Sequence, residues 1–545
     1  MSDIPKREEL GRDVHWDLPE GGWMETKVDF EKTRGRWCYP GIPRAIEHLE
    51  LPNPRKWQPT DKDWQLPDDW KERILSGMSK RLDMFRTFRL FMDICVRCGA
   101  CADKCHFYLG SGDPKNMPVL RGELLRAVYR KEHTLGGKLG FGKLAGAMEL
   151  NEDLLKQWFY YFYQCTECRR CSVFCPYGID TAEITMMGRE LLNLVGININ
   201  WAIEPISNCF RTGNHLGIQP HAFKDNIEFA ADDLEEITGK RVELSFNRKG
   251  AEILFITPSA DYFGNPHYYT FLGYLALFEE IGLDYTFSSY ASEGGNFGLF
   301  TSHELMKRLN DKMYHEAKRL GVKWILGGEC GHMWRVVHQY MDTMNGPADF
   351  LEVPKSPITG TVFENTRSTK MVHIAEFTAD LIKHGAIKLD PSRNDHWTVT
   401  YHDSCNPARG MGLLEEPRYI LKACCNNFHE MPENTIREQT FCCGSGAGLG
   451  NDENIEMRMR GGYPRANAVQ YVNERHGVNA LACMCAIDKA TLQPLVEYWV
   501  PGVEVCGVHE FVGNALILRD EEKERELDMR QEPLLKFRDK EDGDE

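Results

Sequence analysis

Cysteines are the residues of this 545-residue chain whose number and spacing point most directly to chemistry. The chain contains 19 of them, and eight fall into two short runs, 95–105 and 165–175. Both runs read C-x2-C-x2-C-x3-C. In a long chain that begins without an export signal, such clustered thiols favour metal binding or redox chemistry over a framework of disulfide bonds.

The spacing within the two runs is the one with which bacterial ferredoxins bind [4Fe–4S] cubes. Three thiolates two residues apart wrap one corner of a cube. The fourth leaves along the following helix and, in two-cluster proteins, binds the other cube. The predicted ligands of the first cluster are Cys95, Cys98, Cys101 and Cys175. The predicted ligands of the second cluster are Cys165, Cys168, Cys171 and Cys105.

Zinc knuckles and buried free cysteines are the disfavoured alternatives for these runs. Zinc sites generally use paired C-x2-C or Cys/His sets rather than one such run of four cysteines. One departure from the ferredoxin pattern follows the fourth cysteine of the first run. Cys175 is followed by Pro176, whereas Cys105 is followed by His106. We expect this difference to change the local turn more than the ligation.

A third group of cysteines lies in the C-terminal half and comprises Cys405, the vicinal pair Cys442–Cys443, and Cys483-Met484-Cys485. Two adjacent cysteines do not both point into one ordinary apolar pocket, but they are suited to bridging two irons. The glycine-rich segment 444–450 lets the backbone approach closely, so its N–H groups can hydrogen-bond to cluster sulfurs. The pattern favours a redox centre over buried thiols with a glycine turn, or over a regulatory dithiol without metal.

The segments around the first two runs are predicted to be helical. The helix-like stretches are 70–92, 122–133 and 151–164, and in the first of them apolar residues recur near helical spacing. Together they predict a helical two-cluster ferredoxin module over residues 70–245. The helix at 70–92 is interpreted as a core-packing helix rather than one dedicated to docking a partner.

Beyond about residue 250, short apolar segments alternate with helical ones, which predicts parallel βαβ units. The first set of predicted segments is 251–257, 268–281, 284–289, 302–320 and 322–328. The second set is 397–403, 412–425, 428–432, 455–475 and 479–485. The repeated order predicts an internal duplication, with a degenerate first copy over 246–390 and a second copy over 391–518. In this alignment Cys330 lies opposite Cys485.

The expected fold class is therefore α/β plus α, with the helical module followed by the duplicated βαβ domain. Residues 1–69 are rich in tryptophan, proline and charge but keep no long period. They are predicted to form an irregular arm that wraps either its own domains or a partner. Residues 519–545 are predicted to be a charged tail, either a solvated helix or a frayed end.

Charge and composition exclude several functional classes. Asp and Glu outnumber Lys and Arg by 81 to 65, which disfavours nucleic acid as a partner. The longest purely apolar run has about eight residues, whereas a membrane-spanning helix needs about 20, so we expect no transmembrane helix. The N-terminus has no apolar h-region of a secretory signal. No GxGxxG or Walker loop has a convincing strand–helix setting, so we expect no bound flavin or nucleotide.

The pattern C…CCG…C-x-C after two ferredoxin motifs resembles the cysteine-rich CCG domain of HdrD-type heterodisulfide reductase subunits and of DsrMKJOP-type membrane complexes. The resemblance covers about residues 70–515. In that family such cysteines hold a non-cubane [4Fe–4S]-type cluster that cleaves a disulfide. The resemblance implies as ligands Cys405, Cys442, Cys443, Cys483 and Cys485. The last pair departs from the family's C-x-x-C, so Cys330 or the pair Cys424–Cys425 is an alternative or additional ligand.

The same resemblance implies an oxidoreductase that acts on sulfur groups. Electrons would come from a quinol through a cytochrome b membrane subunit of the DsrM type and pass the two cubanes. The third cluster would then reduce, or in reverse oxidise, a disulfide or trisulfide on the small protein DsrC, as in sulfate respiration. The chain would lie on the cytoplasmic face of the cell membrane, held there by the other subunits of a DsrMKJOP-type complex.

Two histidines are candidate proton donors for this reaction. Reducing an S–S bond to two thiols takes two protons with two electrons, and histidine is the side chain best matched to that task near neutral pH. His402 lies three residues before Cys405, and His332 lies two residues after Cys330. The alternative is that each histidine only hydrogen-bonds backbone at the end of a strand.

Two other functions stay open. Iron–sulfur subunits of glycerol-3-phosphate, lactate and glycolate oxidoreductases also join two ferredoxin motifs to CCG domains, and they pass electrons from a separate flavin subunit to quinone. A subunit that only relays electrons is the other alternative. The complete set of five cysteines in the second copy argues against a pure relay, since a relay needs only the cubanes.

Overall fold

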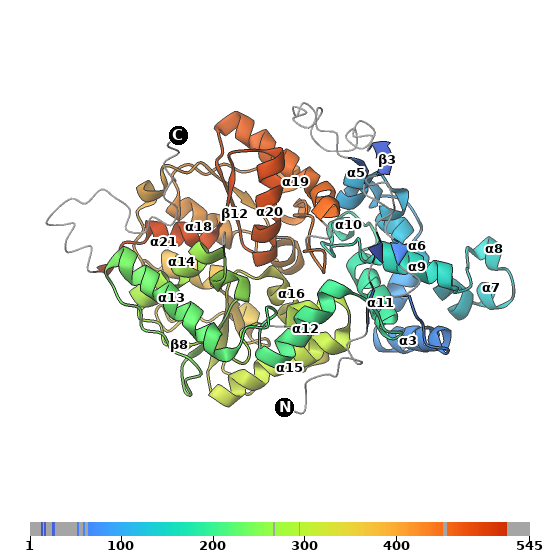
Figure 1. Ribbon diagram of the computed structural model, residues 1–545, viewed down its shortest axis with the longest axis horizontal. Coiled ribbons are helices and arrows are strands. Elements are labelled where there is room, and N and C mark those ends of the chain that lie inside the picture. The colour runs from blue at the N-terminus through green and yellow to red at the C-terminus, as the bar shows by residue number, and fades with distance from the viewer. Residues whose placement is uncertain are drawn as a thin grey trace. The chain divides into compact units, whose positions relative to one another are not determined.

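The computed structural model describes residues 64–264, 267–293, 295–450 and 455–519, together with five short strands nearer the N-terminus. Figure 1 shows these elements with their labels. The chain forms two compact units, each assembled from separate stretches. The first unit comprises residues 1–207, 297–306 and 438–467. The second comprises residues 208–296, 307–437 and 468–545.

The helix predicted over 70–92 is two helices, α3 (Trp70–Met84) and α4 (Arg86–Asp93). They are separated by Phe85, whose backbone is extended at φ −113° and ψ 98°. The buried positions of α3 include Ile74, Met78 and Leu82, which recur at helical spacing. This apolar face packs into the unit, as expected for a core-packing helix.

The remaining helices of the first unit surround the two cysteine runs. They are α5 (His106–Ser111), α6 (Pro118–His133), α7 (Leu135–Lys138), α8 (Gly142–Ala145), α9 (Glu152–Phe162), α10 (Arg170–Val173) and α11 (Thr181–Asn193). Helix α9 begins where the Asn151 side chain accepts the N–H of Leu154 at 2.8 Å, a preferred N-cap arrangement. Helices α9 and α11 pack so closely that a Cβ on Gly188 would overlap the ring of Phe162.

Five short strands lie within the predicted arm. Strand β1 (Arg12–Val14) pairs in parallel with β6 (Ile197–Ile199). Strand β2 (Trp16–Asp17) pairs antiparallel with β5 (Gln58–Pro59), and β3 (Met24–Lys27) pairs antiparallel with β4 (Pro52–Asn53). The rest of residues 1–63 and the predicted tail after residue 519 lie outside the described residues.

Two parallel sheets organise the second unit. The first has the strand order β10-β9-β7-β8 and the second the order β11-β12-β13. The strands of the first sheet are β7 (Ile253–Ile256), β8 (Tyr285–Thr286), β9 (Trp324–Gly327) and β10 (Met371–His373). Those of the second are β11 (Val399–His402), β12 (Ala480–Cys483) and β13 (Glu504–Gly507). Nearly all their residues are buried, as in parallel sheets covered on both faces.

The two sheets share one winding order. Strand β7 pairs with β9 and β9 with β10 in the first sheet, and β11 pairs with β12 and β12 with β13 in the second, all in parallel. The position of β8 is matched in the second sheet by a single parallel bridge between Val399 and Phe428. This common order supports the proposed duplication of the βαβ domain.

Helices follow most strands of the second unit. The longer ones are α13 (Pro220–Thr238), α14 (His267–Ile281), α15 (His303–Leu320), α16 (Gly331–Met344), α17 (Ile374–Lys383), α18 (Glu416–Cys424), α20 (Ala486–Trp499) and α21 (Val508–Ala515). The chain passes between the units within α12 (Asn200–Thr212), α15 and α19 (Ile455–His476). Among the described residues, no helix combines the length and apolarity that crossing a bilayer requires.

Candidate metal centres

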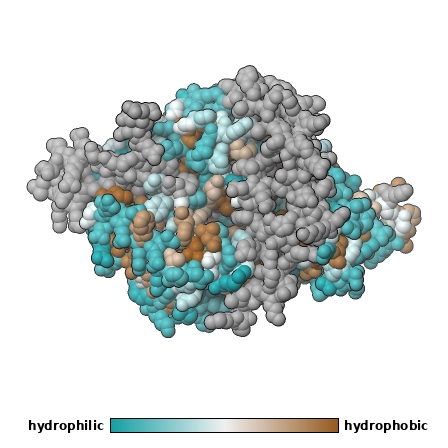
Figure 2. Space-filling model, viewed as in Figure 1, coloured by the Kyte–Doolittle hydropathy of each residue, from teal (hydrophilic) through white to brown (hydrophobic). Residues whose placement is uncertain are grey.

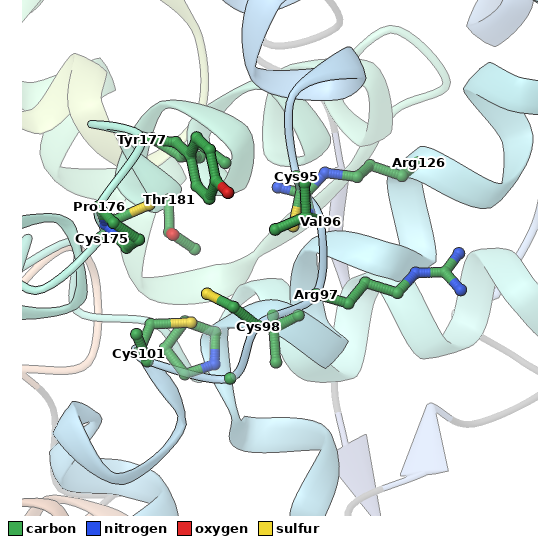
Figure 3. A pocket seen from close by; sticks show the side chains of 15 residues that line it. Cys95, Val96, Arg97, Cys98, Cys101, Arg126, Cys175, Pro176, Tyr177 and Thr181 are labelled. Carbon is green, nitrogen blue, oxygen red and sulfur yellow. The ribbon is translucent and has the colours of Figure 1, made fainter.

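Three cysteines of the first run line a pocket together with one cysteine of the second run. The four are Cys95, Cys98, Cys101 and Cys175. Figure 3 shows their side chains turned toward a common space, beside Tyr177 and Thr181. The structure therefore brings together the four cysteines that the spacing predicts for one cubane, including the exchanged Cys175.

Both ferredoxin loops have the same backbone pattern. Arg97 and Glu167, each directly before the second cysteine, have positive φ angles of 58° and 53°. Gly99 and Arg169, each directly after that cysteine, have φ angles of 77° and 62°. Such left-handed residues are uncommon outside glycine, so their recurrence at equivalent positions indicates that the two loops share one backbone conformation. The residues present thus fit the cubane that their spacing predicts.

One thiol of the first pocket, that of Cys101, is a poor acid in the absence of metal. Burial raises the pKa of Cys101 to about 11. Because only thiolates are good ligands, binding of a cationic cluster must displace this proton, so occupancy is coupled to pH.

A buried arginine faces the cysteines of the second set. Arg121 is nearly inaccessible to solvent and donates to Asn116 Oδ1 at 2.7 Å. Burial would lower its pKa, but Cys165, Cys105 and Cys171 outweigh that effect and raise it. This guanidinium can therefore balance the negative charge of a cluster held by thiolates.

The remaining cysteine of the second set, Cys168, lies with two residues from distant parts of the chain. Ligand atoms of His106, Cys168 and Cys442 are all within 4.8 Å of one another, and all three residues lie in the first unit. Thr166 Oγ1 is 2.9 Å from His106 Nε2 and 3.3 Å from Cys442 Sγ. Since the carbonyl of Gly461, 2.8 Å from His106 Nδ1, can only accept, Nδ1 carries the hydrogen and Nε2 accepts from Thr166.

Two buried arginines hold the Cys442–Cys443 segment against the second ferredoxin loop. The Arg170 guanidinium lies 3.9 Å from the centre of the Phe441 ring, and its Nε donates to Gln439 O at 2.9 Å. Arg189 donates to Ala447 O at 2.7 Å and to Cys165 O at 2.6 Å. These contacts place the vicinal cysteines next to the predicted second cubane.

The glycine after the vicinal pair is required by geometry. Gly444 has a φ of 101°, and a Cβ there would overlap the carbonyl oxygen of Arg458. Its N–H donates to Cys442 Sγ at 3.4 Å. The close approach expected for this glycine-rich segment is therefore present at its first residue.

The other cysteines of the third set lie in the second unit. Cys330 and Cys485 occupy equivalent positions, because Cys330 is the N-cap of α16 after β9 and Cys485 is the N-cap of α20 after β12. A Cβ on Gly331 would lie 3.4 Å from Cys485 Sγ, so the two caps are neighbours. Burial raises the pKa of Cys485 to about 12, while the N–H groups of Gly331 and of the first turn of α20 oppose that rise.

Cys483 and Cys405 belong to adjacent parts of the second sheet. Cys483 ends β12, where its Cα pairs with that of His402 at the end of β11. Cys405 follows in the loop after β11, and both cysteines are buried. By contrast Cys424, Cys425 and Cys506 lie in the hydrophobic core packed on this sheet, which makes them packing residues. Of the proposed third-centre ligands, Cys442 and Cys443 thus belong to the first unit and the rest to the second.

The two candidate histidines are both buried in the second unit. His402 Nε2 lies 3.4 Å from Asp488 Oδ2, in the first turn of α20. Within the described residues neither ring nitrogen of His402 hydrogen-bonds to backbone, so the expected alternative role is not seen for it. His332 is the second residue of α16, the helix whose N-cap is Cys330.

A buried ionic cluster lies between elements of the two sheets. Lys489 Nζ is 3.1 Å from Glu329 Oε2 and 3.7 Å from Asp261 Oδ1, and Glu329 Oε1 is 2.8 Å from His509 Nδ1. Burial raises the pKa of Asp261 to about 6. Burial also opposes ionisation of Glu329, but Lys489 and His509 outweigh it and hold its pKa at about 2. The Lys489 charge also lowers the pKa of nearby Cys483 against a larger rise caused by burial.

Sequence reasoning missed several of these residues. No local sequence pattern marks Arg121, Thr166 or Lys489 as functional, because the role of each depends on neighbours far away in the chain. His106 was visible as the residue that replaces the proline after the fourth cysteine, and its actual contacts are with Thr166 and Gly461.

Comparisons with known proteins bear on the two ferredoxin motifs and on the family of the chain. Residues 91–179 match the family described as "4Fe-4S dicluster domain". The chain is 51% identical to an "Hdr-like menaquinol oxidoreductase iron-sulfur subunit" of Archaeoglobus profundus, over 98% of this chain and 99% of that protein. It is 49% identical to a second protein of the same description from Archaeoglobus fulgidus, over the same shares. It is 27% identical to one subunit of the dihydromethanophenazine:CoB–CoM heterodisulfide reductase of Methanosarcina mazei, over 66% of this chain and 79% of that one.

Proposed function

Because the chain belongs to the family of Hdr-like menaquinol oxidoreductase iron–sulfur subunits, we propose that it carries electrons from menaquinol to a sulfur–sulfur bond. The group also includes DsrK subunits. In the proposed reaction menaquinol gives up two electrons and two protons and becomes menaquinone. Two electrons and two protons cleave the S–S bond of the substrate and leave two thiols. The host's metabolism sets the direction.

The observation that carries the proposal is the hydrogen bond between Cys442 and Thr166. Thr166 belongs to the second ferredoxin loop, and Cys442 belongs to the vicinal pair. This contact supports a short path from the second cubane site to the cysteines proposed for the third centre. A chain that served only as a relay between partners would not need such a path.

The proposed roles of the residues follow from their surroundings. When bound, the two cubanes supply one-electron carriers, and the third, non-cubane cluster supplies an iron for a substrate sulfur. Its proposed ligands are Cys405, Cys442, Cys443, Cys483 and Cys485, with Cys330 beside Cys485 as an additional candidate. His402, beside Asp488, and His332 hold the protons that the product thiols take up. Lys489 provides a fixed positive charge near Cys483.

The proposed partners extend the same interpretation. A DsrM-type cytochrome b subunit would deliver the electrons, and other DsrMKJOP-type subunits would hold the chain on the inner face of the membrane. The disulfide or trisulfide substrate would be carried by DsrC. Copurification with a flavoprotein instead of a haem-b membrane subunit would favour the alternative, a subunit of a glycerol-3-phosphate, lactate or glycolate type of quinone oxidoreductase.

Metal analysis and one variant test the proposal. Anaerobically purified protein should contain about twelve irons per chain, and Cys443→Ser about eight, with both cubane EPR signals retained. Sulfur reduction should be lost in that variant. Cys506→Ala is the matched control, because Cys506 lies in the apolar core and should leave iron content unchanged. Persistence of disulfide reduction after loss of the third EPR signal would show that the third centre is not the catalyst.

A further inference from the structure

The hairpin formed by α7 and α8, residues 134–148, exposes an unusual concentration of large apolar side chains. Single exposed apolar residues are normal on soluble proteins, whereas a contiguous group marks an interaction surface. The exposed fractions are 80% for Leu135, 70% for Leu139, 58% for Phe141, 90% for Leu144 and 50% for Met148. Figure 1 shows α7 and α8 extending away from α6 and α9, and Figure 2 shows apolar residues gathered on this projection.

The stem of the hairpin is fixed on α6, so the apolar side chains cannot simply collapse inward. Arg130 donates to Gly146 O at 3.1 Å and pairs with Glu123 at 2.8 Å. The N–H of Met148 donates to Ala127 O at 3.0 Å. A Cβ on Gly137 would overlap the backbone of Arg130, so only glycine permits this approach.

The charge of the hairpin differs in sign from that of the chain. Residues 134–148 contain two lysines and no Asp or Glu, whereas the whole chain has a formal net charge of −16. Between Leu135 and Met148 the only polar side chains in the sequence are two lysines. One of them, Lys138, is exposed.

We propose that this hairpin is a membrane-contact element that inserts its leucines and phenylalanine into the headgroup region of an anionic lipid bilayer. Apolar residues interleaved with lysines and without acids match a lipid interface, where lysines meet phosphates and apolar groups reach the acyl boundary. The inference rests on the proposed membrane location but not on the identity of the sulfur substrate.

Vesicle flotation of the full-length protein tests the proposal. The wild type should float with vesicles of phosphatidylcholine and phosphatidylglycerol, less with phosphatidylcholine alone, and less at high salt. The double variant Leu139→Ser/Leu144→Ser should bind the anionic vesicles at least about tenfold more weakly. Lys138→Glu should weaken binding and reduce its salt dependence.

Phe350→Ser is the matched control, because Phe350 is a large apolar residue, 45% exposed, in the second unit. It should bind vesicles like the wild type. A wild type that does not float with anionic vesicles would overturn the proposal, as would equal losses in the control and the hairpin variant. Binding only to a membrane protein in detergent would assign the hairpin to a protein partner instead. Iron content and cubane EPR signals should be unchanged in the hairpin variant, so failure here is distinct from failure of the proposed redox function.

Discussion

At the scale of single residues, a different buried arginine lies at each of the two predicted cubane sites. Arg126 lines the first pocket, and Arg121 faces cysteines of the second set. A reduced cluster carries one more negative charge than an oxidised one, so a buried guanidinium stabilises the reduced state. Each arginine is therefore expected to tune its own site.

Replacing Arg121 by glutamine should lower the reduction potential of the second cubane while the first keeps its value. Arg126→Gln is the matched variant and should lower the potential of the first. EPR-monitored redox titration of each protein measures both. Equal shifts of the two clusters in either variant would show that these arginines act through the fold rather than through their own sites.

At the scale of secondary-structure elements, helix α17 depends on an uncharged histidine. His373 Nδ1 accepts the N–H of Ala375 at 3.1 Å, and Glu376 accepts the N–H of His373 at 3.2 Å, which completes a capping box. Protonation of Nδ1 would remove this acceptor. Burial accordingly lowers the pKa of His373 from 6.5 to about 3.

This cap predicts a pH dependence of stability. The unfolded chain takes up a proton near pH 6.5 and the folded chain only near pH 3, so the contribution of His373 is complete above 6.5 and falls as the pH decreases. At pH 5 the loss should be about 2 kcal/mol. His373→Asn keeps a good cap without a titrating group, so it should unfold like the wild type in urea at pH 7 but lose less stability at pH 5. If the variant lost as much free energy of unfolding between pH 7 and pH 5 as the wild type, that result would contradict this role of His373.

Sequence patterns located most helices and strands but not their breaks. Periodicity predicted one helix over 70–92, whereas the extended backbone of Phe85 divides it, because a continuous apolar period does not report a local change of direction. The helix predicted from residue 412 begins at Glu416, after the turn at Asn406–Gly410. The α7–α8 hairpin was not recognised, since exposure of apolar residues depends on what packs over them.

At the scale of the whole molecule, the ionic cluster around Lys489 links elements that follow both sheets of the second unit. Lys489 comes from α20 after β12, whereas Asp261 and Glu329 follow β7 and β9. Burying an ion pair contributes little net stability, but removing one partner leaves an uncompensated buried charge.

Lys489→Met should therefore lower the free energy of unfolding by about 3–5 kcal/mol. Lys323→Met removes a partly exposed partner of Glu252 and should cost less than about 1 kcal/mol. Chemical denaturation of both variants at pH 7 measures the difference. The double variant Lys489→Met/Glu329→Gln should regain part of the lost free energy of unfolding, because it removes one of the two buried carboxylates left without Lys489. A double variant as unstable as Lys489→Met would argue against a charge effect.

The sequence alone was enough to predict the cubane ligands and the βαβ units. The spacing of the cysteines and the period of a strand or helix are local properties of the chain, so they can be recognised without the tertiary structure. Only the tertiary structure placed Cys442 beside Thr166 and Cys168, since the contact between Cys442 and Thr166 joins residues 276 positions apart. The tertiary structure also shows that Cys424 and Cys425 lie in an apolar core. It shows as well that Arg121 lies near the second cysteine set. Burial and distant neighbours arise from the packing of the complete chain, and no local spacing encodes them.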